Sequence, residues 1–162
     1  MKIIVRPGVI LHPVSASIIG EIGDQAGVAE CTVTSTDRPP QRQAEAMYKN
    51  LKKGISASYA PPGQAVIAVY NKWSHLAQPI VVQMMVEEIL RQGPEKVSNH
   101  CLPPDAPIWV VDILPMQDLA LLRAFVAAAQ AHPRIKRVLH PLGGRKAKGY
   151  DPVIHLEIWK AA

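Results

Sequence analysis

Residues 108–113 read Ile-Trp-Val-Val-Asp-Ile, and residues 153–159 read Val-Ile-His-Leu-Glu-Ile-Trp. Both segments are short and apolar, and they are rich in β-branched and aromatic residues, which is typical of buried β-strands. Asp112 interrupts the first segment, and a carboxylate buried there without a partner would cost several kcal/mol, so it needs a compensating cation. His155 and Glu157 interrupt the second segment and lie two residues apart, on one face of the strand.

The positions of proline and glycine and the spacing of apolar residues outline the rest of the chain. We expect helices at residues 15–25, 41–53, 64–77, 79–92 and 117–131, and further strands at residues 30–36 and 134–140. Ser15 or Ser17 is available as the N-cap of the first helix. This order predicts an α+β fold in which helices pack on a small, mostly antiparallel sheet.

The length of 162 residues predicts a single domain, residues 1–162, with a core large enough to need no disulfide. We expect Cys31 and Cys101 to be thiols, although the sequence alone leaves their pairing open. The longest apolar run falls short of the roughly 18 residues that a membrane span needs. We therefore expect no membrane partner.

Lysine and arginine number 18 against 13 aspartate and glutamate, a formal charge of +5. This excess permits an acidic partner such as nucleic acid, anionic lipid or anionic cell wall, without choosing among them. Residues 1–7 carry one lysine and too short an apolar stretch for a secretory signal. We therefore expect the chain to be made in the cytoplasm without its own export signal.

The sequence has no phosphate-binding glycine loop, no His-Glu-x-x-His helix and no Gly-x-Ser-x-Gly nucleophile elbow. Among its 6 histidines, His100 and His155 stand out, because His100 follows Ser98 shortly before the Asp112 strand. Two histidines and a carboxylate, with a fourth position for water, make an open catalytic zinc site. The alternative is a core carboxylate bonded to backbone N–H groups beside two unrelated histidines, and residue types alone leave both possibilities open.

Four short segments follow one another in an order typical of one enzyme family. They are Ser35-Thr36-Asp37-Arg38, Ser98-Asn99-His100, Val110-Val111-Asp112-Ile113 and Val153-Ile154-His155-Leu156-Glu157-Ile158. In this order they resemble the zinc D-alanyl-D-alanine carboxypeptidases and the phage L-alanyl-D-glutamate endopeptidases, which share a fold with the hedgehog signalling domain. The resemblance covers about residues 30–159.

The resemblance implies a zinc metallopeptidase that hydrolyses a peptide bond in peptidoglycan, and a phage endolysin that reaches the wall after lysis is one such enzyme. In that family His100, Asp112 and His155 would hold Zn²⁺, and Arg38 would bind a substrate carboxylate or the developing oxyanion. Ser98 would brace the loop or donate to a neighbouring ligand. The partner would be a peptidoglycan stem peptide, not nucleic acid, and neither the bond cut nor the oligomeric state follows.

The general base is the main departure from the family pattern. Many members carry Glu or Asp three residues before the last histidine, where this chain has Pro152. Asp151 and Glu157 are the candidate catalytic residues, Asp151 being preferred. The loop between His100 and Asp112 is also longer than usual. A non-catalytic family member acting as a structural or binding module is therefore one alternative, and a basic nucleic-acid-binding domain, supported only by charge, is another.

Overall fold

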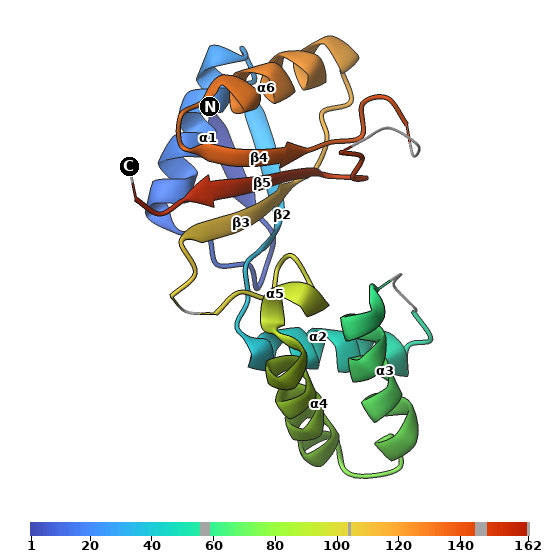
Figure 1. Cartoon of the computed structure of the whole chain (residues 1–162). Coiled ribbons are helices and arrows are strands. Elements are labelled where there is room, and N and C mark those ends of the chain that lie inside the picture. Colours follow the sequence, from blue (N-terminus) through green and yellow to red (C-terminus); the bar gives the residue numbers. More distant parts are fainter. Residues whose placement is uncertain (56–58, 104, 145–148, 162) are drawn as a thin grey trace. The chain divides into compact units, whose positions relative to one another are not determined.

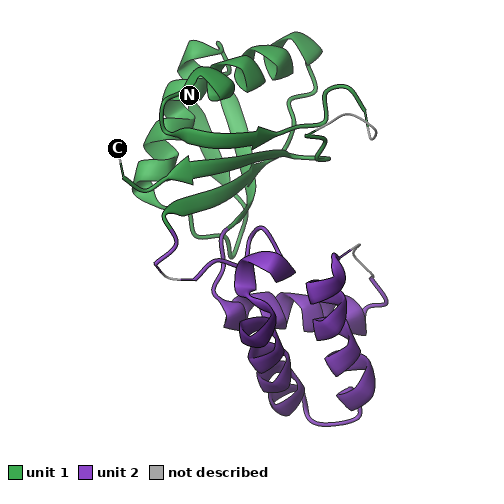
Figure 2. Cartoon of the chain, viewed as in Figure 1, with its two compact units in different colours: residues 1–36, 107–162 green, residues 37–106 purple. Residues whose placement is uncertain are grey.

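The computed structural model describes residues 1–55, 59–103, 105–144 and 149–161, shown along the sequence in Figure 1. These residues form a 5-stranded sheet and six helices, so the predicted α+β class is confirmed. The chain divides into two compact units, residues 1–36 with 107–162, and residues 37–106 (Figure 2). The single domain expected from the length stays a prediction.

The first unit holds the sheet, whose strands lie in the order β1-β2-β3-β5-β4. Their bounds are β1 Lys2–Val5, β2 Glu30–Thr36, β3 Ile108–Ile113, β4 Ile135–Leu139 and β5 Ile154–Trp159. The expectation of a mostly antiparallel sheet is corrected here: the sheet is mixed, because β1 pairs with β2 in parallel while β2, β3, β5 and β4 pair antiparallel. Strand β1 was not predicted, because 4 residues are too few to show a clear period of two.

Helices α1 (Pro13–Gln25) and α6 (Leu119–Ala131) lie side by side in Figure 1 and share one core with the sheet. Alternation along each strand sends every second side chain into this core. On β3 these are Val111 and Ile113, and on β5 they are Ile154, Leu156 and Ile158. The residues between them, Asp112 and His155 included, therefore lie on the opposite face of the sheet.

The second unit is helical and has its own core. Its helices are α2 Pro40–Lys52, α3 Pro61–Trp73, α4 Gln78–Gln92 and the short α5 Pro94–Val97. Each begins with proline at one of its first two positions, where the missing N–H costs nothing and the fixed φ suits a helix. Met47, Val66, Val81 and Met85 are among the fully buried residues where these helices meet.

Several helix ends differ from the predicted ones, and the caps explain two of them. Helix α1 begins at Pro13, because Nδ1 of His12 accepts the Val14 N–H at 3.3 Å and so acts as the N-cap instead of Ser15 or Ser17. Helix α6 begins at Leu119, because the Asp118 carboxylate accepts two N–H groups of its first turn. Within the described ranges, none of the helices has both the length and the apolarity needed to cross a membrane.

Candidate metal centre

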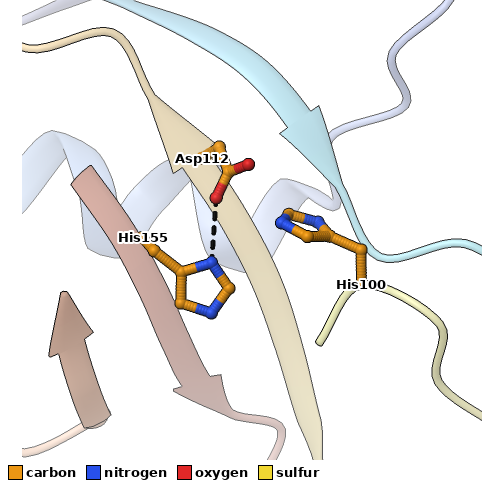
Figure 3. Close-up of side chains that lie close together, drawn as sticks. All are labelled: His100, Asp112 and His155. Atoms are coloured by element: carbon orange, nitrogen blue, oxygen red, sulfur yellow. Dashed lines mark hydrogen bonds and ion pairs between the residues drawn. The ribbon is translucent and has the colours of Figure 1, made fainter. Parts of the chain in front are cut away.

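Asp112 and His155 face each other across the middle of the sheet. The antiparallel register of β3 and β5 places the two residues directly opposite, where Cβ atoms lie about 4.5–5.5 Å apart. Oδ1 of Asp112 and Nδ1 of His155 are 2.9 Å apart and form a hydrogen bond, drawn in Figure 3. The backbone therefore brings together two polar side chains that are far apart in the sequence.

Both side chains of this pair are withdrawn from water. His155 is 2 % exposed and the Asp112 side chain is 15 % exposed. At such burial a carboxylate is stable only when it is hydrogen-bonded or paired with a cation. The sequence predicted that Asp112 needs a compensating partner, and the His155 imidazole is one such partner.

His100 lies in the second unit, in a turn that backbone hydrogen bonds hold in place. Its carbonyl accepts the Arg38 N–H at 2.7 Å, and the Arg38 carbonyl accepts the Leu102 N–H at 3.3 Å. Ser98 Oγ accepts the His100 N–H at 3.2 Å, so Ser98 braces the loop that carries this histidine. Arg38 follows β2 by two residues, so the hydrogen bonds connect the His100 turn to the chain leaving the sheet.

His100, Asp112 and His155 each offer one ligand atom, and these atoms lie within 4.8 Å of one another. Figure 3 shows the three side chains close together. Sequence reasoning had singled out these three residues, and they form a possible metal site.

The donor set fits zinc in kind and number. Zinc holds nitrogen and oxygen ligands at about 2.0–2.2 Å, so that ligand atoms in a tetrahedron lie about 3.3–3.6 Å apart. The hydrogen-bonded atoms of His155 and Asp112, 2.9 Å apart, would separate by only about half an ångström to match this spacing.

Glu157, one candidate base, is held in two ion pairs. Lys136 Nζ lies 2.9 Å from its Oε2 and Arg137 Nη1 lies 3.4 Å from its Oε1. The Glu157 side chain is only 9 % exposed, whereas the Lys136 and Arg137 side chains are 41 % and 54 % exposed, so water partly screens both ion pairs. Both cations lie on β4, so Glu157 links β5 to β4 through ion pairs, a role that its position in the sequence did not indicate.

Asp151, the other candidate base, lies in the turn before β5. Its Oδ1 accepts the Val153 N–H at 3.0 Å, two residues ahead, which is an Asx-type turn around Pro152. Its own N–H donates to the His140 carbonyl at 3.2 Å. The turn around Pro152 therefore fixes the direction of the Asp151 carboxylate.

Two buried polar groups were missed by sequence reasoning. Nδ1 of His140 and Oε1 of Gln43 are buried without a hydrogen-bond partner among the described residues. His140 was interpreted as structural because a proline follows it, and Gln43 lies in an amphipathic helix where a glutamine carries no signal. Only the packing around them identifies these atoms.

Comparison with known proteins assigns the chain to no family. None of the protein-family models, curated proteins or solved structures compared with the chain matches it.

Proposed function

We propose that this chain is a zinc-dependent peptidase that hydrolyses a peptide bond in bacterial cell-wall peptidoglycan. The observation that carries the proposal is the buried His155–Asp112 pair, 2.9 Å between Nδ1 and Oδ1, with His100 as the third ligand. Two imidazoles and a carboxylate leave one tetrahedral position open, as catalytic zinc sites do. When bound, zinc would polarise a carbonyl and lower the pKa of its bound water towards 7.

The chain's own residues would divide the remaining tasks. His100, Asp112 and His155 would hold the ion, and Arg38 would bind an anionic group of the substrate through its rigid guanidinium donors. The net charge of +5 would favour association with an anionic wall.

Asp151 is the preferred general base in this proposal. A general base must accept a proton within hydrogen-bonding reach of the reacting group. Both oxygens of Glu157 are already ion-paired to Lys136 and Arg137, whereas the Val153 N–H binds and orients Oδ1 of Asp151. Glu157 then serves to hold β4 against β5 beside His155.

The first experiment is the zinc content of the purified protein, measured for the wild type and for His100→Ala, Asp112→Ala and His155→Ala. We expect one zinc per chain in the wild type and loss of zinc in each variant. His75→Ala is the matched control, because His75 is an exposed histidine in the turn after α3. A wild type that takes up no zinc when it is supplied would overturn the proposal.

The second experiment is digestion of purified peptidoglycan, with the released fragments identified by mass. Release of free D-alanine would indicate carboxypeptidase action, and release of larger stem peptides would indicate endopeptidase action. Intact zinc without any product would instead support a non-catalytic binding module that retains the metal.

A further inference from the structure

Positively charged side chains outnumber carboxylates where β4 runs beside β5. The register of the two strands shifts between Ile135 and Arg137, an irregularity typical of a β-bulge. Lys136 and Arg137 both reach one carboxylate, that of Glu157, at 2.9 and 3.4 Å. Two cations therefore share a single negative charge, and a net positive charge remains.

Arg134 adds a third cation at the start of this strand pair. Its Nε and Nη2 donate to the Trp159 carbonyl at 3.2 and 2.7 Å, and Nη2 also donates to the Lys160 carbonyl at 3.0 Å. Both acceptors are neutral, and none of the carboxylates among the described residues pairs with Arg134. The surplus of positive charge is therefore larger than the two ion pairs of Glu157 indicate.

Trp159 presents an indole ring on a fixed backbone beside these cations. It is 37 % exposed, and Lys136 Nζ lies 5.4 Å from the centre of its ring. Its N–H donates to the Arg134 carbonyl at 2.9 Å, opposite the bonds that its own carbonyl accepts. An exposed indole on a rigid strand end provides a large contact area at a low cost in conformational entropy. Arg134, Lys136, Arg137, Glu157 and Trp159 form the β4–β5 cluster.

The β4–β5 cluster lies on the same face of β5 as His155. Side chains alternate along a strand, so His155, Glu157 and Trp159 point to one face. Leu156 and Ile158, which lie between them, belong to the core. At about 3.3 Å per residue, Glu157 is about 7 Å and Trp159 about 13 Å along the strand from His155. A polymer held at His155 spans this distance within a few units.

We propose that Lys136, Arg137 and Trp159 form a second binding site, for a sugar ring that carries a carboxylate. The C–H face of the sugar stacks on the indole, and the carboxylate accepts charge-assisted hydrogen bonds from both cations. Among the described residues Arg137 contacts Glu157 through Nη1, which leaves further guanidinium N–H groups for a ligand. An acidic wall sugar as the ligand rests on the proposed function, because it places a second part of the same polymer on this face of β5.

Single-stranded nucleic acid is the competing ligand, because it also combines anionic groups with rings that stack. Its binding sites typically use several aromatic side chains for successive bases, whereas Trp159 is the one aromatic residue of the β4–β5 cluster. The Glu157 carboxylate also lies among the cations. It would repel a chain of phosphates, whereas hydroxyl groups of a sugar can donate to it.

The test compares N-acetylmuramic acid with N-acetylglucosamine, two sugars that differ by the lactyl group bearing the carboxylate. Each is titrated by NMR into the purified protein in the presence of a chelator. We expect the acidic sugar to bind about fivefold more tightly, and this preference to shrink as salt is added. The indole N–H signal of Trp159 should shift, and those of Trp73 and Trp109 should not.

Two kinds of variant separate the charge from the ring. Lys136→Gln and Arg137→Gln should each reduce the preference and together abolish it, with binding of N-acetylglucosamine unchanged. Trp159→Ala should weaken both sugars by a similar factor, because stacking does not depend on the carboxylate. The control is Arg91→Gln, which removes an exposed arginine that also pairs with one carboxylate, that of Glu88 on α4. It should leave both affinities unchanged.

The preference is a ratio measured within one variant, so a partial loss of stability does not mimic the expected result. Equal binding of both sugars by the wild type, no binding of either, or a preference that survives the double Lys136→Gln, Arg137→Gln variant would each overturn the inference. Tighter binding of thymidine monophosphate than of the acidic sugar would overturn it in favour of nucleic acid. The chelator makes these outcomes independent of zinc, whereas a protein that takes up no zinc would contradict the proposed function instead.

Discussion

His155 and Asp112 lie opposite each other on β5 and β3, with 2.9 Å between Nδ1 and Oδ1, on the face of the sheet turned away from the α1 and α6 core. The register of the two antiparallel strands places these side chains together. The next residue pair in the same register, Ile113 and Ile154, points to the other face of the sheet, into the core. Any shift of register by one residue would send one of the two side chains into that core.

The Asp112→Asn variant should separate metal binding from folding. Asparagine keeps an oxygen for His155 but loses the negative charge, so we expect zinc affinity to fall by about 10–100-fold or more. The free energy of unfolding without metal should change by only about 1 kcal/mol, since one hydrogen bond is kept. Zinc titration and urea unfolding of the same sample measure the two quantities. Zinc affinity equal to that of the wild type would show that Asp112 is not a ligand.

The Asp151→Asn variant should lose hydrolysis while keeping its fold. The asparagine side-chain oxygen still accepts the Val153 N–H that Asp151 accepts at 3.0 Å, so the turn should be preserved. Loss of a general base typically costs about 10²–10⁴-fold in rate. Product release from peptidoglycan, measured beside zinc content, checks this expectation. Full activity in Asp151→Asn would transfer the role to another group.

The Glu157→Gln variant should behave in the opposite way. It removes the charge that Lys136 and Arg137 share and leaves these two half-exposed cations facing a neutral amide. We expect a loss of about 1 kcal/mol in the free energy of unfolding, because the two cations are partly hydrated, with the rate per folded molecule close to wild type. Stability is measured by urea unfolding, and activity is corrected for the folded fraction. A rate that falls while stability stays unchanged would make Glu157 the base.

The predictable part of this fold is the part that depends on local pattern. Strands β2 and β3 begin and end at the predicted residues, because alternating or continuous apolar runs bounded by proline are strong signals. Asp112 and His155 were singled out because a charged or titratable residue inside an apolar strand needs a reason to be there, and His100 because it follows Ser98 shortly before the Asp112 strand.

The part that could not be predicted depends on contacts across the fold. The parallel pairing of β1 with β2 depends on long-range packing, and no sequence pattern of 4 residues encodes it. The ion pairs of Glu157 come from β4, some 20 residues away in sequence. The unsatisfied oxygen of Gln43 is visible only when its surroundings are known.

The two cysteines should make the folded state sensitive to alkaline pH. Burial raises the pKa of Cys31 and of Cys101 from 9.0 to about 11. The unfolded chain loses these protons near pH 9 while the folded chain keeps them, so the unfolded state binds fewer protons and stability falls as pH rises from about 9 to 11. Below pH 9 both states are protonated, and the effect is absent.

Urea unfolding of the wild type and of a Cys31→Ala, Cys101→Ala variant at pH 8, 9, 10 and 11 measures this dependence. Lysines and tyrosines titrate in both proteins, so the difference between the curves isolates the thiols. We expect the wild type to lose about 1–3 kcal/mol more than the variant for each thiol over this range. Parallel curves would show that the thiols ionise equally in both states.

Two glycines in different backbone conformations should respond to alanine with opposite signs. Gly20 lies inside α1, and a Cβ there would meet nothing within 4 Å, so Gly20→Ala should stabilise the protein by about 0.5–1 kcal/mol through helix propensity.

Gly54 has φ +70 and also has open space around it. Gly54 follows the end of α2. The Ile55 N–H donates to the Asn50 carbonyl and the Gly54 N–H donates to the Leu51 carbonyl, and these two hydrogen bonds form a Schellman cap. Gly54→Ala should therefore cost about 1–2 kcal/mol, because only the backbone conformation penalises the added methyl group. Thermal unfolding of both variants beside the wild type tests the pair, and a Gly54→Ala protein as stable as the wild type would show that the cap does not hold this conformation in solution.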